Sequence, residues 1–304
     1  MQNQTFTRTY SPRQAMLARR TPQQQAVQQT AAQIDTAPSG VLEQYHIRSE
    51  PYYRVVSDEI ELYEAAYSVR MPIMLKGPTG SGKTRFVEYM AWKLGKPLIT
   101  VACNEDMTAS DLTGRFLLDA NGTHWQDGPL AVAARYGAIC YLDEVVEARQ
   151  DTIVSIHTLT DARRMLPLEK KGEVIEAHPD FQLVISYNPG YQSLMKDLKQ
   201  STKQRFGALD FDYPEHDIEA EIVAHESGVS LDVAKNLVHI AERARNLKGH
   251  GLDEGLSTRM LIYAGSLISK GVQPLAACRV ALVRPITDDA DMRDALDSAV
   301  TTYF

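Results

Sequence analysis

Short, continuous runs of apolar residues alternate with helical patterns over the first two thirds of the chain. Four runs are clear and a fifth is weaker: 72–75, 97–101, 138–142, 181–186 and 209–213. Apolar residues at helical spacing cover 58–69, and a second helical pattern runs from Gly82 to Leu94. Apolar runs of this length between helices are typical of a parallel sheet with both faces covered. We therefore predict an α/β fold.

The pattern changes after Pro214, where apolar runs of the strand type stop. The remaining chain is helical in pattern, with breaks near 227–230, 248–256 and 271–274. We therefore place a domain boundary near residue 214. It separates an α/β domain over 45–214 from a small all-α domain over 215–304.

Composition narrows the class of protein. Of the 304 residues, 44% are apolar and 23% are charged, which is typical of a soluble globular chain. The longest apolar stretches, such as Met260–Ile268, are well short of the ~20 residues that a membrane helix needs. The first 39 residues hold no apolar core of a signal peptide. We therefore expect a cytoplasmic protein without a membrane span.

Charge is distributed unevenly. Residues 1–40 hold four Arg, one Asp and nine Gln, a net charge of +3, whereas the rest holds 28 basic and 38 acidic side chains, a net charge of −10. We interpret residues 1–44 as a basic, mostly disordered extension. It is either a docking arm for an acidic surface, such as a client or a protein-shelled compartment, or a passive solvated tail. The acidic body argues against general binding of duplex DNA.

Residues 77–84 match the phosphate-binding pattern G-x-x-x-x-G-K-[ST] in full. They are Gly77, Pro78, Thr79, Gly80, Ser81, Gly82, Lys83 and Thr84, and Arg85 follows them. An apolar strand precedes this loop and a helix follows it, so that backbone N–H groups and the helix N-terminus face bound phosphates. Lys83 would reach the β/γ-phosphates and Thr84 would ligate Mg²⁺. The pattern predicts a site for ATP and Mg²⁺; the structural alternative is a Gly-rich turn without a ligand.

Polar residues that could complete such a site follow later strands. Asp143 and Glu144 directly follow the run 138–142; Asp143 would hold Mg²⁺ through water, and Glu144 would orient the attacking water. Asn188 either positions that water or is a turn residue before Pro189. Arg205 and Arg259 are candidates for a guanidinium at the γ-phosphate. Spacing alone assigns neither Arg, and chemistry alone favours an ordinary surface or helix-capping residue in each case.

The order of these motifs resembles that of the AAA+ ATPases. Segments 108–115, 125–130 and 161–168 resemble the MoxR branch, and within it 77–88 and 187–191 resemble the CbbQ/NirQ/NorQ subfamily. The resemblance covers about 45 to 300. It implies that Asn188 is sensor 1, that Arg205 is an arginine finger acting on the neighbouring subunit, and that Arg259 is a sensor 2 acting within its own subunit.

The resemblance also implies an assembly and a type of client. Such proteins form homo-hexameric rings and act with a partner that carries a von Willebrand factor A domain. The inserts 112–130 and 165–176 are expected to be hairpins near the ring axis, with tight turns at Asn121-Gly122 and Lys171-Gly172; ordinary surface hairpins are the alternative. Residues 161–173 and 50–53 look most like the Cbb type, whose client is Rubisco. Nitric oxide or nitrite reductase is the alternative client.

Two other classes of function compete with that of a remodelling motor. A nucleotide-gated binding adaptor, in which turnover is incidental, is the alternative from another class, although the intact pair Asp143-Glu144 argues against it. A DNA-directed ATPase is disfavoured by the acidic body. The eight His show no ligand spacing and the three Cys form no metal pattern, so no metal beyond Mg²⁺ is expected.

Overall fold

The structure is a computed structural model that describes residues 40–120, 122–189, 198–247, 252 and 254–304. The predicted extension lies almost entirely outside the described residues, and so does Asn121 of the expected tight turn. Within the described part, residues from Gly40 onward belong to one compact unit. None of the helices described there combines the length and the apolar character that a bilayer span requires.

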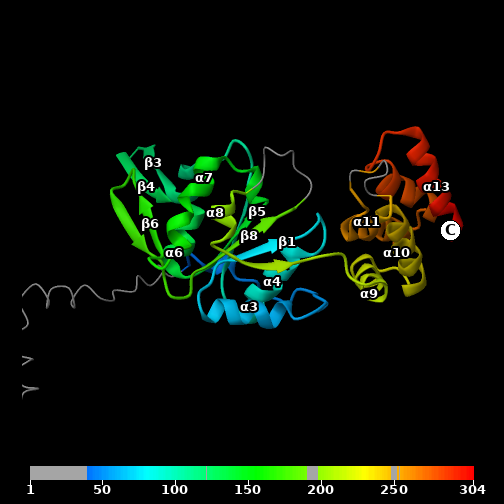
Figure 1. Ribbon diagram of the computed structural model, residues 1–304, viewed down its shortest axis with the longest axis horizontal. Coiled ribbons are helices and arrows are strands. Elements are labelled where there is room, and N and C mark those ends of the chain that lie inside the picture. Colours follow the sequence, from blue (N-terminus) through cyan, green and yellow to red (C-terminus); the bar gives the residue numbers. More distant parts are fainter. Residues whose placement is uncertain (1–39, 121, 190–197, 248–251, 253) are drawn as a thin grey trace, which may run out of the picture. The chain divides into compact units, whose positions relative to one another are not determined.

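A five-stranded parallel sheet forms the centre of the α/β region, in the order β2-β5-β8-β1-β9 (Figure 1). Its strands are β1 (Ile73–Lys76), β2 (Leu98–Ala102), β5 (Ile139–Asp143), β8 (Gln182–Tyr187) and β9 (Gly207–Asp210). The four clear apolar runs are therefore strands, as predicted. Every residue of β8 is buried, which explains a continuous apolar run rather than an alternating one.

The fifth strand was predicted two residues too late. β9 pairs with β1 from Ile73↔Gly207 to Lys76↔Asp210, so it ends before Phe211. The apolar residues Phe211 and Tyr213 pack elsewhere. The Phe211 N–H donates to the Lys76 carbonyl at 2.6 Å, and the ring lies 5.2 Å from that of Phe86. Their apolar character therefore reflects packing beyond the end of the strand.

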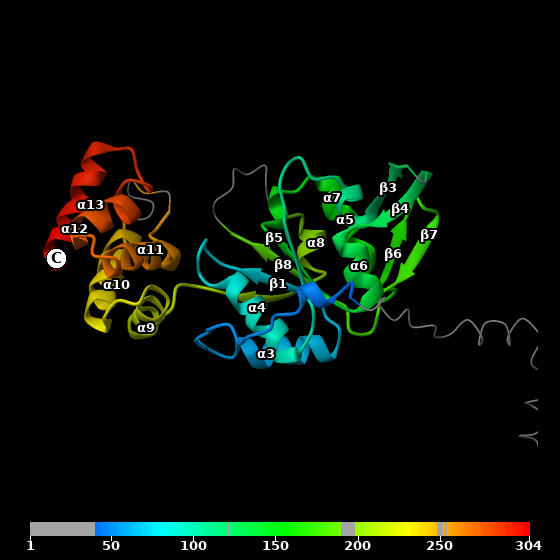
Figure 2. The same ribbon diagram turned by 180° about the vertical axis from the view of Figure 1, so that it is seen from behind.

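Helices cover both faces of the sheet (Figures 1 and 2). On one face, α3 (Glu59–Ser68) and α4 (Lys83–Leu94) bury Tyr63 and Phe86 against Leu75 of β1. On the other, α6 (Pro129–Tyr136) buries Leu130 against Met74 of the same strand. Shorter elements complete this layer: α5 (Ala109–Thr113), α7 (Gln150–Ser155) and α8 (Gln200–Lys203), with 3-10 turns at Glu43–Tyr45, Val145–Glu147 and His157–Leu159.

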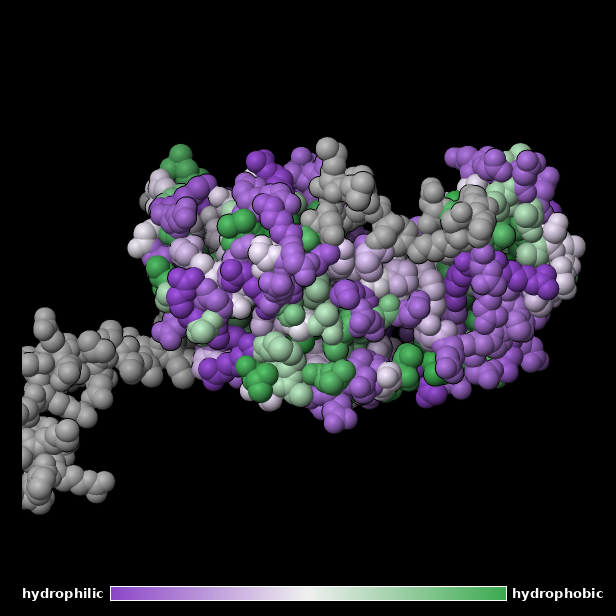
Figure 3. Space-filling model, in the orientation of Figure 1, coloured by the Kyte–Doolittle hydropathy of each residue, from purple (hydrophilic) through white to green (hydrophobic). Residues whose placement is uncertain are grey.

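Both predicted inserts are antiparallel hairpins, and the two lie side by side in both views (Figures 1 and 2). The first pairs β3 (Gly114–Asp119) with β4 (Gly122–Asp127), and the second pairs β6 (Met165–Leu168) with β7 (Glu173–Glu176). The second turns where expected: Gly172 has φ +72° and its N–H donates to the Leu168 carbonyl. The first exposes apolar surface (Figure 3), with Leu118 82% and Phe116 50% exposed.

Residues after Pro214 are helical, as predicted. They form α9 (His216–Ser227), α10 (Leu231–Arg245), α11 (Thr258–Ser269), α12 (Pro274–Cys278), a π-helical turn (Arg279–Val283) and α13 (Ala290–Tyr303). A further break precedes α13, where the Asp289 carboxylate accepts the Met292 N–H at 2.9 Å. These helices share a cluster of buried side chains of their own. The boundary near residue 214 stays a prediction.

A buried ionic network joins α9, α10 and the start of α11. The fully buried Glu219 carboxylate accepts two hydrogen bonds from the Arg245 guanidinium, at 2.6 and 2.7 Å, and one from the Thr258 hydroxyl at 2.6 Å. Arg245 Nε donates to the Leu256 carbonyl at 2.9 Å. The guanidinium also lies over the Tyr213 ring, 3.7 Å from its centre. The network therefore fixes the segment that leads into α11.

We expect Glu219→Ala to lower the free energy of unfolding by about 3–5 kcal/mol, because it leaves a guanidinium in the interior without its counter-ion. Urea unfolding followed by circular dichroism measures this change. The matched control is Asp288→Ala, which removes an exposed carboxylate paired with Arg293 at 2.7 Å and should not move the midpoint. Equal midpoints for Glu219→Ala and the unmodified chain would contradict the importance of the network.

Candidate nucleotide-binding site

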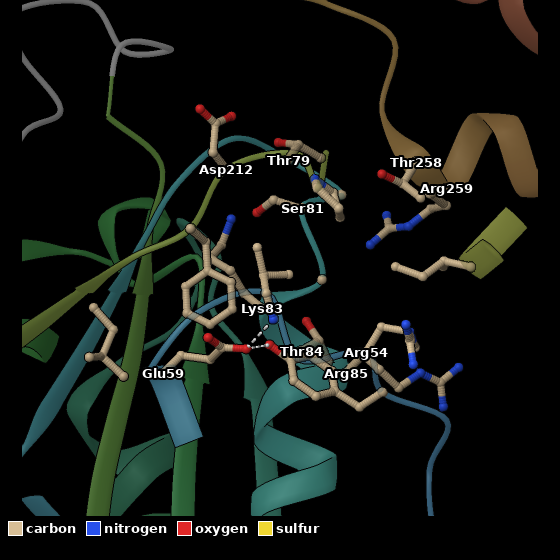
Figure 4. Close-up of a pocket in the computed structure, with 18 of the residues that line it drawn as sticks. Arg54, Glu59, Thr79, Ser81, Lys83, Thr84, Arg85, Asp212, Thr258 and Arg259 are labelled. Carbon is tan, nitrogen blue, oxygen red and sulfur yellow. Dashed lines mark hydrogen bonds between the residues drawn. The ribbon is translucent and has the colours of Figure 1, made fainter. Parts of the chain in front are cut away.

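A cavity of about 680 Å³ lies where the loop after β1 meets the end of β5 and the start of α11. The glycine-rich loop forms one wall, and Asp143, Glu144 and Asn188 contribute from the ends of two central strands. Arg259 lines it from α11, and Figure 4 shows its side chain extending toward the loop. Four of the five predicted catalytic residues are therefore brought together, and Arg205 is not among the lining residues.

The glycine-rich loop after β1 turns through glycines with left-handed backbone conformations. Gly80 and Gly82 have φ of +71° and +92°, values that side chains disfavour. Gly82 ends the loop and α4 begins at Lys83, so the first N–H groups of the helix face the cavity. The predicted strand–loop–helix context is therefore present.

Close packing makes two of the glycines obligatory. A Cβ on Gly77 would lie 2.2 Å from the Phe211 carbonyl oxygen, and one on Gly80 would lie 2.6 Å from the Ser257 Cβ. Distances below 3.0 Å require that a neighbour move. The loop is thus held between the segment after β9 and the segment before α11.

Lys83 is the buried cation of the site. Its ammonium group donates to the carbonyls of Gly77 and Pro78, both at 2.8 Å. Burial lowers the pKa of Lys83 to about 8, and the charge of Arg259 acts in the same direction. The carboxylates of Asp143 and Glu144 oppose that shift. Bound phosphates would add negative charge beside the ammonium group and favour its protonated form.

The Asp143 carboxylate is held by side chains of two neighbouring strands. It accepts hydrogen bonds from the Tyr141 hydroxyl at 2.7 Å and the Ser186 hydroxyl at 2.6 Å. Burial raises the pKa of Tyr141 above its usual range. The hydroxyl therefore stays protonated and can donate this hydrogen bond. The Thr84 hydroxyl lies 3.5 Å from the second carboxylate oxygen. Hydroxyl and carboxylate oxygens are the type of ligand that a hard cation such as Mg²⁺ prefers.

Glu144 has a strained backbone and an exposed side chain. Its φ of +55° is in the left-handed region, which a residue other than Gly or Asn rarely adopts. The same Ser186 hydroxyl that donates to Asp143 accepts the Glu144 N–H at 2.7 Å. The Ser186 hydroxyl thus holds both members of the acidic pair: it binds the side chain of Asp143 and the backbone of Glu144.

Asn188 follows β8 and contacts the glycine-rich loop. Its Nδ2 donates to the Thr79 hydroxyl at 3.2 Å. Its Oδ1 is buried and has no hydrogen-bond partner among the described residues. A buried amide oxygen of this kind can accept a hydrogen bond from a water molecule or a ligand. The geometry favours the water-positioning interpretation of Asn188 over that of a turn residue.

Arg205 lies outside the cavity, two residues after the end of α8 (Gln200–Lys203). Its backbone N–H donates to the Thr202 carbonyl at 3.0 Å. Its Nε is buried and has no hydrogen-bond partner among the described residues. The structure therefore places Arg205 away from the cavity of its own chain.

The residues that lead into α3 also line the cavity, among them Tyr52, Tyr53 and Glu59. From the sequence, Tyr53 and its neighbours were either packing residues of this entry segment or a contact to adenine. The Glu59 carboxylate, 8% exposed, accepts the Tyr53 hydroxyl and the Val56 N–H, both at 2.9 Å. Tyr52 stacks on His225 of α9 at 3.6 Å. Only the aromatic pair Tyr52-Tyr53 could have suggested this wall, and nothing in the sequence signals Glu59 as its organising residue.

The sheet order, the phosphate-binding loop, the acidic pair and the helical C-terminal region together define an AAA+ ATPase. The family model described as AAA domain (dynein-related subfamily) matches residues 72–206. A RuvB mutant from Thermotoga maritima has the same fold, with a TM-score of 0.50 and 16% identity, covering 80% of this chain and 68% of that one.

Within this class the chain belongs to the CbbQ/NirQ/NorQ family. The family model described as CbbQ/NirQ/NorQ C-terminal matches residues 219–303. The chain is 74% identical to Protein CbbQ of Hydrogenophilus thermoluteolus over 86% of this chain and 98% of that protein. It is 53% identical to Protein NorQ of Paracoccus denitrificans over 84% of this chain and 94% of that protein. The resemblance seen in the sequence is therefore confirmed.

Proposed function

We propose that the protein is a Mg²⁺-dependent ATP-hydrolysing motor that remodels a client enzyme. One observation carries this proposal: a single cavity unites the glycine-rich loop with Asp143, Glu144 and Asn188. Phosphoryl transfer needs little more than positioning and charge stabilisation, and these groups supply both. Lys83 and the backbone N–H groups between Gly77 and Arg85, Pro78 excepted, hold the phosphates, and Glu144 activates water.

Thr84 and Asp143 are the residues that would hold Mg²⁺. The Thr84 hydroxyl and the Asp143 carboxylate, which Tyr141 and Ser186 fix, would hold the ion between them. When bound, it would supply neutralisation of the phosphate charge. Asn188 holds the attacking water with its unpartnered Oδ1, and Arg259 of α11 stabilises the γ-phosphate within the same subunit.

We further propose that the protein works as a homo-hexameric ring. Arg205 lies outside the cavity of its own chain and its Nε lacks a partner among the described residues. A head-to-tail ring presents such a residue to the cavity of the next subunit. The β3–β4 and β6–β7 hairpins are proposed to contact the partner or client, for which the exposed Leu118 and Phe116 provide an apolar surface.

For the client, we propose inhibited Rubisco, engaged together with a partner that carries a von Willebrand factor A domain, in the cytoplasm. The support is the likeness to Protein CbbQ, at 74% identity. Nitric oxide or nitrite reductase remains the second candidate, because Protein NorQ and a denitrification regulatory protein NirQ are 53% and 56% identical. The N-terminal extension is proposed as a docking arm.

A reactivation assay tests this proposal. Rubisco carrying a tight inhibitory sugar phosphate is incubated with the protein, the partner and ATP, and carboxylation is followed. We expect activity to return with ATP and not with a non-hydrolysable analogue. Full recovery with the analogue would instead support the nucleotide-gated adaptor. If the protein instead restored the activity of a nitric oxide reductase and had no effect on Rubisco, the reductase would be the client.

A further inference from the structure

Two histidines and one glutamate converge on the outer side of the α9–α10 pair. His216 is the first residue of α9, and His239 and Glu242 are one turn apart on α10. His216 Nδ1 lies 3.1 Å from one oxygen of the Glu242 carboxylate, and His239 Nδ1 lies 3.3 Å from the other. The imidazole rings are 4.2 Å apart. Three side chains of types that bind metals, from two helices, thus lie next to one another.

The spacing of these groups matches a tetrahedral metal site. In such a site with metal–ligand distances of about 2.0–2.1 Å, ligand atoms are about 3.3 Å apart. One donor atom from each of the three residues lies within 4.8 Å of the other two. Each imidazole nitrogen is near the tetrahedral distance from a different oxygen of the Glu242 carboxylate, at 3.1 and 3.3 Å. Small side-chain rotations bring the three donors into the first shell of an ion.

Neighbouring contacts hold the cluster while leaving it accessible. The His239 ring stacks on Tyr303 of α13, with ring centres 5.2 Å apart and an interplanar angle of 13°. Asn236 of α10 donates from its amide to the Tyr303 carbonyl at 3.0 Å. The three side chains are 25%, 44% and 43% exposed, so a cation can reach them from solvent and keep a water molecule as its fourth ligand.

We propose that His216, His239 and Glu242 bind a divalent transition-metal ion, for which Zn²⁺ fits best. Two imidazoles and one carboxylate are a ligand set that zinc uses with an open fourth position. The same set is poor for Mg²⁺, which requires oxygen ligands. The ion ties the first turn of α9 to the middle of α10, next to the C-terminal helix. The absence of ligand spacing in the sequence is explained, since the residues come from two helices.

The alternative is that both imidazoles simply form hydrogen-bonded ion pairs with Glu242. Zinc titration of the untagged full-length chain, followed by isothermal titration calorimetry in buffer without Mg²⁺, distinguishes the two. We expect one high-affinity Zn²⁺ per chain. The variants His239→Gln and Glu242→Gln should each weaken binding by about tenfold or more, since even the loss of an outer partner has such an effect.

His124→Gln is the matched control, because His124 also lies 3.3 Å from a carboxylate, that of Asp119, but outside the cluster, and its loss should not alter zinc affinity. Tetrahedral Co²⁺, read by its visible absorption, should bind with the same dependence on His239. ATP turnover serves as the folding check, since none of these residues lines the nucleotide cavity. The proposal is overturned if the unmodified chain binds no zinc, or if His239→Gln and Glu242→Gln both leave the zinc affinity unchanged.

Discussion

Glu144→Gln is expected to lower ATP turnover by about 100-fold or more while nucleotide binding persists. Of the acidic pair, Glu144 is the residue whose side chain is exposed. Gln has the same shape as Glu, but its amide cannot accept a proton from water. Asp143, its Tyr141 and Ser186 partners, and the glycine-rich loop are unchanged by the substitution. Steady-state phosphate release and the affinity for a fluorescent ATP analogue measure the two properties separately.

Glu147→Gln is the control for this variant. Glu147 is three residues away, in the 3-10 turn after β5, and does not line the cavity. Its replacement should leave turnover unchanged. If Glu144→Gln instead abolished binding and hydrolysis together, with native secondary structure retained, the residue would hold the nucleotide rather than activate water.

Arg205→Ala is expected to reduce turnover by about a thousandfold or more, as the loss of an arginine finger does. Because Arg205 lies outside its own cavity, the missing guanidinium should be replaceable by another subunit. Mixing Arg205→Ala with Glu144→Gln, both inactive alone, should therefore restore activity. In an equimolar random ring about a quarter of the interfaces combine an intact Glu144 with an intact Arg205.

Arg259→Ala provides the matched control for the mixing experiment. Arg259 lines the cavity of its own chain, so a subunit without it has no working site whatever its neighbour supplies. Mixing Arg259→Ala with Glu144→Gln should remain inactive. Activity in this second mixture, or none in the first, would reverse the assignment of the two arginines.

Much of the fold follows from local pattern. Strands buried on both faces give continuous apolar runs, so four strands of the sheet were found within about a residue of their ends. The fifth was misplaced because Phe211 and Tyr213 are apolar for another reason: they pack beyond the strand, and the Tyr213 hydroxyl donates to the Thr79 carbonyl at 3.2 Å. Burial pattern alone does not distinguish pairing from packing.

The residues of the site likewise fall into those that the sequence predicts and those that only the folded structure reveals. The glycine-rich loop is contiguous, and its residue types are dictated by the phosphates, so sequence is enough to find it. Ser186, Glu59 and Glu219 act through partners that are distant in the chain or on the backbone, as when Glu219 meets Arg245 and Thr258. The His216–His239–Glu242 cluster is likewise invisible until α9 and α10 pack. Tertiary proximity has no signature in a single sequence.

The contact between Gly80 and Ser257 has a mechanical consequence. With only 2.6 Å between a hypothetical Cβ at Gly80 and the Ser257 side chain, the phosphate loop and the residue preceding α11 have no free space between them. We expect a nucleotide that displaces the loop toward Ser257 to push the first turn of α11, and Arg259 with it. We expect this coupling to rest on steric repulsion, so that high salt, which screens ion pairs, should leave it unaffected.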